Sequence, residues 1–361
     1  MTGLSRRTLL RTGAAGLAIA ALPGSGRASP GPGWRSFIVT MRTEVKAPKG
    51  ETRLWLPVPS SIDADWVRAD EPKISTSGQA AIEPIGGQAE RLLSVTFPAS
   101  AQSAVAEVVT VVETRDRQVD FATPAGAAGL APDQAAFYTR GTELIPVDGI
   151  VKDTAATITA GATTDLEKAR AIYEWVVDNT FRNPKTRGCG TGDVAGMLKS
   201  GNLGGKCADI NALYVGLARA SGLPARDVYG IRVAPSRRGF KSLGASSEVI
   251  SKSQHCRAEV WLAGFGWVPI DPADVRKVAL EEPPGNLPLT SEPVRRAREL
   301  LFGAWEMNWV PYNTAHDLKL QGASGTLPFL MYPTGQTGDA TLDSLDPDAF
   351  SYTITSREIV S

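Results

Sequence analysis

The stretch Gly204-Gly205-Lys206-Cys207-Ala208-Asp209 stands directly before an amphipathic run of helical period. One face of that run carries four apolar side chains: Ile210, Leu213, Leu217 and Ala218. This spacing predicts a helix over about 208–221, which Gly222 and Pro224 end. The start of a helix has unpaired N–H groups and a positive dipole, which lower a thiol pKa and stabilise an oxyanion. Cys207 therefore stands where a nucleophile would be expected.

Two strand-like stretches follow, 254–262 and 266–271, joined by a turn near Gly264. Because alternate side chains share a face of a strand, His255 lies opposite the apolar face that carries Cys256. By the same rule Asp271 points to the side of His255, at a similar distance from the turn. An aspartate in this place can orient an imidazole, so Cys207, His255 and Asp271 form a candidate triad. The other histidine, His316, lies in a polar stretch without such neighbours.

A helix followed by antiparallel strands predicts an α+β core. The segments Gly205-Lys206-Cys207-Ala208-Asp209, His255-Cys256-Arg257-Ala258-Glu259-Val260-Trp261 and Gly266-Trp267-Val268-Pro269-Ile270-Asp271-Pro272 together resemble the transglutaminase-like superfamily of papain-like cysteine enzymes. The resemblance covers roughly 150–280. It implies a nucleophile-bearing helix against an antiparallel sheet, with Cys207 as nucleophile, His255 as base and Asp271 as orienting acid. Cys256 and Arg257 stand where an alanine or an aromatic residue often follows the histidine of the family.

Other features of the site are less defined by the sequence. The backbone N–H of Cys207 is the first candidate oxyanion donor, and Asn183 and Asn202 are alternatives for a side-chain donor. Cys189 and Cys256 form a disulfide in one hypothesis that leaves Cys207 free. The histidines and cysteines lack the spacing of zinc ligands, and the glycine-rich stretch before Cys207 lacks the Lys-Ser/Thr ending of a phosphate-binding loop. We therefore expect no metal and no cofactor.

The first residues predict export. Arg6 and Arg7 precede a short apolar run over 13–22, and a cleavage site is expected after Ala28, which is typical of a twin-arginine signal peptide over 1–28. We therefore expect a bacterial protein that is periplasmic or secreted, with no transmembrane segment after signal cleavage. Lys plus Arg and Asp plus Glu number 38 each, so the net charge favours no nucleic-acid partner.

Three further regions are predicted after the signal. Alternating strands predict a sandwich-like all-β domain over 34–122, and a helix that begins after Thr164 belongs to a catalytic domain over 126–280. A C-terminal extension over 281–361 ends in a strand whose pairing the sequence leaves open. The polar, glycine- and serine-rich stretch 235–253 predicts a mobile surface loop.

The function expected from these residues is that of a secreted thiol enzyme. It would attack amide bonds of a peptide or protein, including a cell-envelope peptide, through an acyl-thioester. Hydrolysis by a peptidase or amidase is favoured by analogy with bacterial relatives. Protein cross-linking by a transglutaminase is the alternative, because an amine can replace water. A non-catalytic protein that binds peptides or the cell envelope is the rival from another class.

Overall fold

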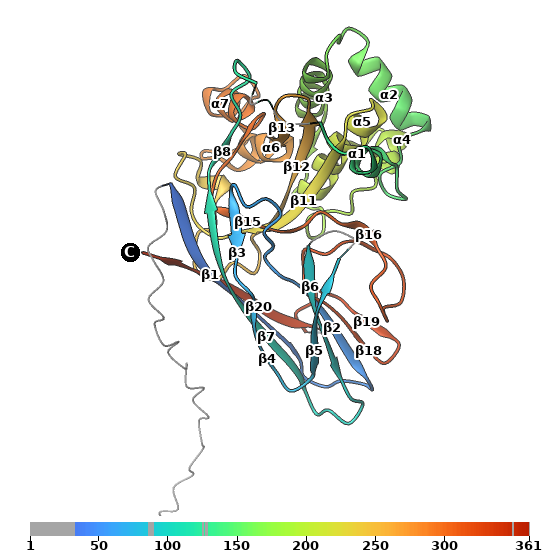
Figure 1. The fold of residues 1–361 in the computed structure, drawn as a ribbon, viewed down its shortest axis with the longest axis vertical. Helices are drawn as coiled ribbons and strands as arrows, with labels where there is room; N and C mark the ends of the chain where they lie inside the picture. Colours follow the sequence, from blue (N-terminus) through green and yellow to red (C-terminus); the bar gives the residue numbers. More distant parts are fainter. Residues whose placement is uncertain (1–32, 86–89, 125, 127–128, 349, 361) are drawn as a thin grey trace, which may run out of the picture.

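Two five-stranded antiparallel sheets occupy one end of the molecule, and most helices gather at the other (Figure 1). The computed structural model describes residues 33–360 apart from 86–89, 125, 127–128 and 349. The predicted signal peptide, 1–28, lies outside the described residues. Among the described helices, none has the length and apolar character needed to cross a membrane.

The two sheets form the strand-rich N-terminal part. The first contains β20 (Ser351–Ile359), β1 (Trp34–Val45), β7 (Ala104–Arg115), β3 (Val67–Ala69) and β4 (Lys73–Thr76). The second contains β19 (Ala340–Leu342), β18 (Thr334–Thr337), β2 (Thr52–Pro57), β6 (Arg91–Phe97) and β5 (Gln79–Pro84). Burial alternates along β1 and β7, as the period-2 pattern predicts. Phe37, Leu54 and Val95, from both sheets, belong to one apolar core.

A four-stranded antiparallel sheet forms the base of the helical part. Its order is β13 (Gly266–Ile270), β12 (Gln254–Leu262), β11 (Ala225–Arg232) and β15 (Trp309–Asn313). Helix α5 (Cys207–Ala220) packs against β12 and β11. The remaining helices are α1 (Pro132–Thr139), α2 (Gly149–Thr159), α3 (Asp165–Asn179), α4 (Val194–Ser200), α6 (Pro272–Glu281), α7 (Glu292–Leu300) and the short η1 (Lys241–Leu243). The α+β core with a helix against an antiparallel sheet is thus confirmed.

Three further short strand pairs lie among the described residues. They are β9 (Phe181–Arg182) with β10 (Gly204–Gly205), β8 (Arg117–Gln118) with β14 (Ala304–Trp305), and β16 (His316–Leu318) with β17 (Leu327–Phe329). The start predicted for α3 is confirmed in detail. Thr164 accepts a hydrogen bond from the Glu167 N–H, and the Glu167 carboxylate accepts one from the Thr164 N–H, which completes a capping box.

The stretch 281–361, expected to be an extension, instead contributes strands to all three large sheets. It supplies β15 to the sheet beside α5, β18 and β19 to one sandwich sheet, and β20 to the other. The sequence left the pairing of the final strand undecided. In the structure this strand, β20, pairs with β1 from Ser36↔Ile359 to Glu44↔Ser351. The stretch 235–253 also differs from the predicted mobile surface loop, because Phe240, Leu243 and Ile250 are buried in the core.

Candidate active site

Cys207 is the first residue of α5, and the side chain of Asp209 holds the chain around it. The Asp209 carboxylate accepts hydrogen bonds from three backbone N–H groups: Thr191 (2.9 Å), Gly192 (3.0 Å) and Lys206 (3.0 Å). Gly205 leaves room for this carboxylate, because a Cβ there would lie 2.5 Å from Asp209 Cβ. The glycine and the acidic residue on either side of Cys207 therefore fix its position at the helix N-terminus.

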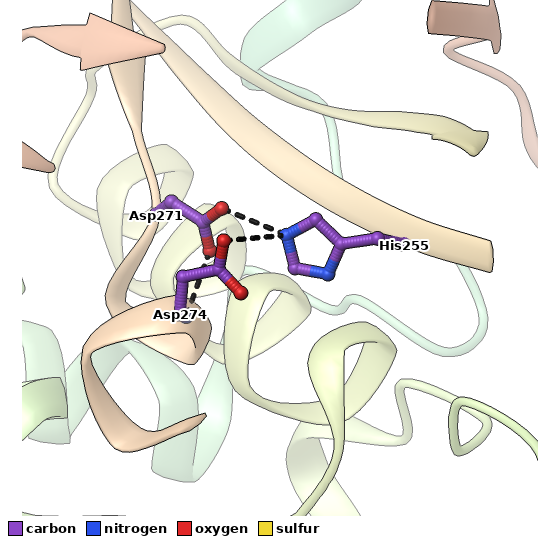
Figure 2. A group of neighbouring side chains, drawn as sticks. All are labelled: His255, Asp271 and Asp274. Carbon is purple, nitrogen blue, oxygen red and sulfur yellow. Dashed lines mark hydrogen bonds and ion pairs between the residues drawn. The ribbon is translucent and has the colours of Figure 1, made fainter. Parts of the chain in front are cut away.

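His255, the second residue of β12, points its Nε2 at two carboxylates (Figure 2). Nε2 lies 2.8 Å from Asp271 Oδ2 and 3.4 Å from Asp274 Oδ2. Asp271 follows β13 and caps α6, where its Oδ1 accepts a hydrogen bond of 3.1 Å from the Asp274 N–H. These contacts fix the imidazole through Nε2, which leaves Nδ1 for exchange of a proton with another group.

Two arginines neutralise the carboxylates beside His255. Arg232 binds Asp274 at 2.6 Å, and Arg257 Nε lies 3.7 Å from Asp271 Oδ2. All of these groups are buried. His255, Asp271 and Asp274 offer ligand atoms within 4.8 Å of one another, so they could hold a metal ion. A divalent cation would compete there with both guanidinium groups, which already balance the charge.

The charged form of His255 is stabilised in this setting. Burial and the charge of Arg232 act against protonation, but Asp274 and Asp271 outweigh them and raise the pKa of His255. The salt bridge to Arg232 lowers the pKa of Asp274 despite its burial. His255 can therefore carry a proton above its ordinary titration range.

Three thiols meet at the N-terminus of α5. Hydrogen bonds from Cys189 and Cys256, together with His255, lower the pKa of Cys207 against the effect of burial. The pKa values of Cys189 and Cys256 are raised, by the interaction with Cys207 and by burial. All three cysteines are free, so the hypothetical Cys189–Cys256 disulfide is not formed.

The position of Cys256 corrects the strand-facing prediction. Cys256 was expected to lie apart from Cys207, on the other face of β12, but its thiol is a neighbour of Cys207. The reason is that α5 crosses the face of β12 that carries Cys256, where Asn211 Nδ2 donates to the Cys256 carbonyl. His255, the second residue of β12, also interacts with Cys207 and lowers the pKa of its thiol.

The polar face of β12 is buried as well. The Arg257 guanidinium lies 4.7 Å from the ring centroid of Trp309 and 5.4 Å from that of Trp305. The Glu259 carboxylate pairs with Arg226 at 2.6 Å and with Arg117. The side chains of Trp305, on β14, and Trp309, on β15, lie over this face, so the side chains that alternate with the apolar ones are also in the interior.

Cys207 and His255 open into a cavity of about 560 Å³. Segments far apart in sequence form its walls: the loop with Gly188 and Cys189, the stretch 251–254 that leads into β12, and residues of the C-terminal part that include Tyr332 and Tyr352. Gln254 lines the cavity, and its side chain interacts with the Tyr352 hydroxyl, whose pKa burial raises and this contact lowers only in part. The buried Nε2 of Gln254 completes no hydrogen bond of good geometry with a described residue. In the sequence, only its place next to His255 could have pointed to Gln254.

Asn183 and Asn202, the two alternative oxyanion donors, instead accept hydrogen bonds from backbone N–H groups of their own loops. Asn183 Oδ1 accepts from the Lys185 N–H at 3.0 Å, and Asn202 Oδ1 accepts from the Gly204 N–H at 3.1 Å. Neither residue lines the cavity. His316 lies elsewhere, beside Thr142 and Arg219, and burial lowers its pKa.

Comparisons with known proteins agree with this arrangement. A family model described as Transglutaminase-like superfamily matches residues 152–272, the stretch that holds Cys207, His255 and Asp271. An uncharacterized protein from Haemophilus influenzae is 36% identical over 333 residues, which cover 87% of this chain and 88% of the relative. A candidate cysteine protease from Cytophaga hutchinsonii shares the fold, with a TM-score of 0.56 and 12% identity over 91% of this chain and 92% of that one.

The family match covers α5, β11, β12 and β13, which are the elements that carry the buried cysteine, histidine and aspartate. The similarity to the relative from Haemophilus influenzae extends over most of both chains, so it includes the strand-rich part as well as the helical part. The chain belongs to the transglutaminase-like superfamily.

Proposed function

We propose that this protein is a cysteine enzyme that cleaves amide bonds with Cys207 as nucleophile, His255 as acid and base, and Asp271 as the group that orients His255. One observation carries the proposal. His255 is buried with Nε2 bound to Asp271 at 2.8 Å, and it neighbours a thiol whose pKa is lowered. This combination favours a thiolate paired with an imidazolium, the reactive form of a cysteine nucleophile.

The reaction would proceed in two stages. The Cys207 thiolate attacks the carbonyl carbon, a C–S bond forms, and the C–N bond breaks as His255 gives its proton to the departing amine. Water then attacks the thioester while His255 accepts one of its protons, and the C–S bond breaks to return the thiolate and release the acid. The net change is an amide plus water converted to an acid and an amine.

Two donors are available for the oxyanion that forms in each stage. The Cys207 N–H belongs to the first turn of α5, whose N–H groups have no acceptor within the helix. Gln254 Nε2 is the second candidate, because Gln254 lines the cavity and its buried Nε2, beside Tyr352, completes no hydrogen bond of good geometry with a described residue. A donor fixed before the reaction stabilises the developing charge without a cost of reorganisation.

Charge favours water over a lysine side chain as the acyl acceptor. Of the described residues that line the cavity, six are lysine or arginine and none is acidic. A protonated lysine would be repelled on its approach to the thioester, whereas water would not. Amide hydrolysis is therefore the leading activity, with transfer to an amine as the alternative.

Purified protein tests this directly. It is incubated with a peptide mixture and a primary amine, and mass spectrometry separates cleavage, deamidation and amine incorporation. We expect cleavage or deamidation, with an acyl adduct on Cys207 after acid quenching, and none of these with Cys207→Ala. Amine incorporation as the main product would support cross-linking instead. An unmodified Cys207 that still retains peptides would support the non-catalytic binding role.

The place of action is a second proposal, which rests on the sequence of residues 1–28. Export by the twin-arginine route would place the enzyme in the periplasm or outside the cell. Expression of the full chain with Arg6→Lys and Arg7→Lys tests this. We expect the double variant to stay unprocessed in the cytoplasm and the parent chain to appear outside it, cleaved near Ala28; equal processing of both would contradict the route.

A further inference from the structure

The cavity that contains Cys207 and His255 carries an excess of positive charge. Its cationic side chains are Arg182, Arg187, Lys206, Arg232, Lys252 and Lys277. Three carboxylates pair with some of them. Glu281 binds Arg182 and also Lys277, the latter at 2.7 Å. The other two pairs are Asp343 with Arg187 at 2.5 Å and Asp274 with Arg232 at 2.6 Å.

Lys206 and Lys252 have no ion-pair partner among the described residues, so six cations face only three carboxylates. The positive charges in the cavity affect the pKa of Lys277. Burial lowers the pKa of Lys277, and the positive charges of Arg232 and Arg182 lower it further. Neither of the two unpaired lysines is needed to neutralise the His255–Asp271 pair, which Arg232 and Arg257 already accompany.

The two unpaired lysines flank the reacting groups. Lys206 directly precedes Cys207 at the start of α5, and Lys252 stands three residues before His255, in the stretch that leads into β12. Both line the same cavity as the thiol. An anionic group held between them would lie close to the carbonyl that Cys207 attacks. The lining of the cavity is partly apolar, with Leu345, Pro347 and Phe350, which suits the carbon skeleton of a peptide.

We infer that the acyl substrate is a peptide that carries a carboxylate close to the scissile amide, and that Lys206 and Lys252 bind this carboxylate. The inference rests on the proposed function, whose substrate class it names. A carboxylate can come from an acidic side chain or from the free C-terminus of a short peptide, and the cavity would bind both by the same contacts. Charge complementarity of this kind selects the substrate and speeds its approach.

Two alkylating agents of nearly equal size test the charge at the thiol. Iodoacetate is anionic and iodoacetamide is neutral, so the ratio of their rates with Cys207 cancels the thiolate fraction and reports the local potential. We expect this ratio to exceed that of glutathione by about tenfold at low salt, and to fall towards it in 0.5 M NaCl because salt screens exposed charges. Peptide mapping assigns the alkylation to Cys207.

Substitution of each lysine tests which side chains supply the positive charge near Cys207. Lys206→Gln and Lys252→Gln should each lower the rate ratio by about threefold, and Lys252 is exposed, so its substitution should not disturb folding. Lys199→Gln is the matched control, because Lys199 is exposed and does not line the cavity. We expect Lys199→Gln to keep the ratio of the parent protein.

Peptides then separate the two sources of the carboxylate. One set exchanges Glu for Gln at each position around the scissile amide, and a second set compares a free C-terminus with its amide. A higher kcat/KM for the acidic member, by about tenfold, identifies the source, and Lys252→Gln should reduce that preference. An equal kcat/KM for every acidic and neutral pair would overturn the inference.

The outcomes distinguish this inference from the proposed function. Fast alkylation of Cys207 by iodoacetamide, with a rate ratio like that of glutathione and no effect of either lysine, overturns the carboxylate site and leaves the activated thiol in place. Alkylation of Cys207 by iodoacetamide at the rate of an ordinary thiol would overturn the proposed function itself. A high ratio that both lysine variants lower, together with a higher kcat/KM for an acidic peptide than for its neutral partner, supports the inference.

Discussion

At the scale of single residues, the reactivity of Cys207 depends on the side chains that meet at its sulfur. Cys189, Cys256 and His255 all lower its pKa, while the other two thiols have raised pKa values. The positive end of α5 acts in the same direction. These contacts therefore favour negative charge on one sulfur of the three, the one beside His255.

This distribution of charge predicts the pH dependence of alkylation. The Cys207 thiolate forms as pH rises through a lowered pKa, and the His255 imidazolium persists until pH exceeds a raised pKa, so the ion pair exists between the two. Between pH 8 and pH 6 an ordinary thiol loses roughly two orders of magnitude in thiolate content. We expect the rate of Cys207 with iodoacetamide to fall by less than about tenfold over this range.

The control for this profile is His255→Ala. Without the imidazolium the pKa of Cys207 should rise, and the alkylation profile should move towards that of glutathione. Samples are quenched at set times and analysed by peptide mapping, so that alkylation of Cys189 and Cys256 is not counted in the rate of Cys207. A parent profile that runs parallel to glutathione would contradict the lowered pKa.

Gln254 gives a second prediction at this scale. If its Nε2 donates to the oxyanion, Gln254→Ala should lower kcat by about a hundredfold, as the loss of a single oxyanion donor does. Alkylation by iodoacetamide passes through no oxyanion and should change little. Asn183→Ala and Asn202→Ala are the controls, because neither residue lines the cavity. A larger loss of kcat in either asparagine variant than in Gln254→Ala would reverse the assignment.

At the scale of elements, the sequence predicted what short-range patterns encode. The apolar spacing of α5, the capping residues of α3 and the alternation of β1 and β7 all arise from neighbours within a few positions. The same patterns brought His255 and Asp271 together, because one tight turn joins their strands.

What the sequence did not predict depends on contacts between distant segments. Alternation separates the two faces of β12, but it does not say that α5 covers one and that the side chains of Trp305 and Trp309 cover the other. Cys256 was therefore expected to be remote from Cys207, and the burial of Arg257 was not foreseen. The C-terminal wall of the cavity was missed for the same reason, since Gln254 and Tyr352 meet only in the folded chain.

The ion pairs of Glu259 allow a prediction about how β12 is joined to its neighbours. Glu259 on β12 binds Arg226 on β11 and Arg117 on β8, and the carboxylate is fully buried. Removal of one partner from a buried pair leaves uncompensated charge, so Glu259→Gln should lower the free energy of unfolding by about 3 kcal/mol at pH 7. Urea denaturation followed by tryptophan fluorescence measures the loss.

The effect of Glu259→Gln on the free energy of unfolding should depend on pH. Burial opposes ionisation of Glu259, but Arg226 and Arg117 lower its pKa in the folded protein. The stabilisation is complete above the unfolded pKa of about 4.3 and declines as pH falls towards the folded pKa. The difference between parent and variant should narrow from pH 7 to pH 4. Glu51→Gln, which removes an exposed pair with Arg53, should cost less than about 0.5 kcal/mol at both pH values. A constant difference at Glu259 would contradict the lowered pKa.

At the scale of the whole molecule, the last strand joins the first and also touches the site. β20 pairs with β1 along its length, and Ile354 at its centre is fully buried. The Ile354 N–H donates to Ser251 Oγ at 2.8 Å, and its carbonyl accepts from the Ile250 N–H at 2.8 Å. The segment held in this way leads directly into Gln254 and His255.

This connection predicts that the sandwich and the site unfold together. Ile354→Ala should lower the free energy of unfolding by about 2–4 kcal/mol, the cost of a truncated core side chain, and it should shift the exposure of Cys189 and Cys256 to the same lower urea concentration. Tryptophan fluorescence and thiol labelling, measured on the same samples, should give coincident transitions. Val360→Ala is the control, because Val360 is 87% exposed and its loss should leave both transitions in place. If the fluorescence transition moved while the cysteines stayed protected to the urea concentration of the parent, the two ends of the molecule would be independent, and β20 could not support the cavity through Ser251.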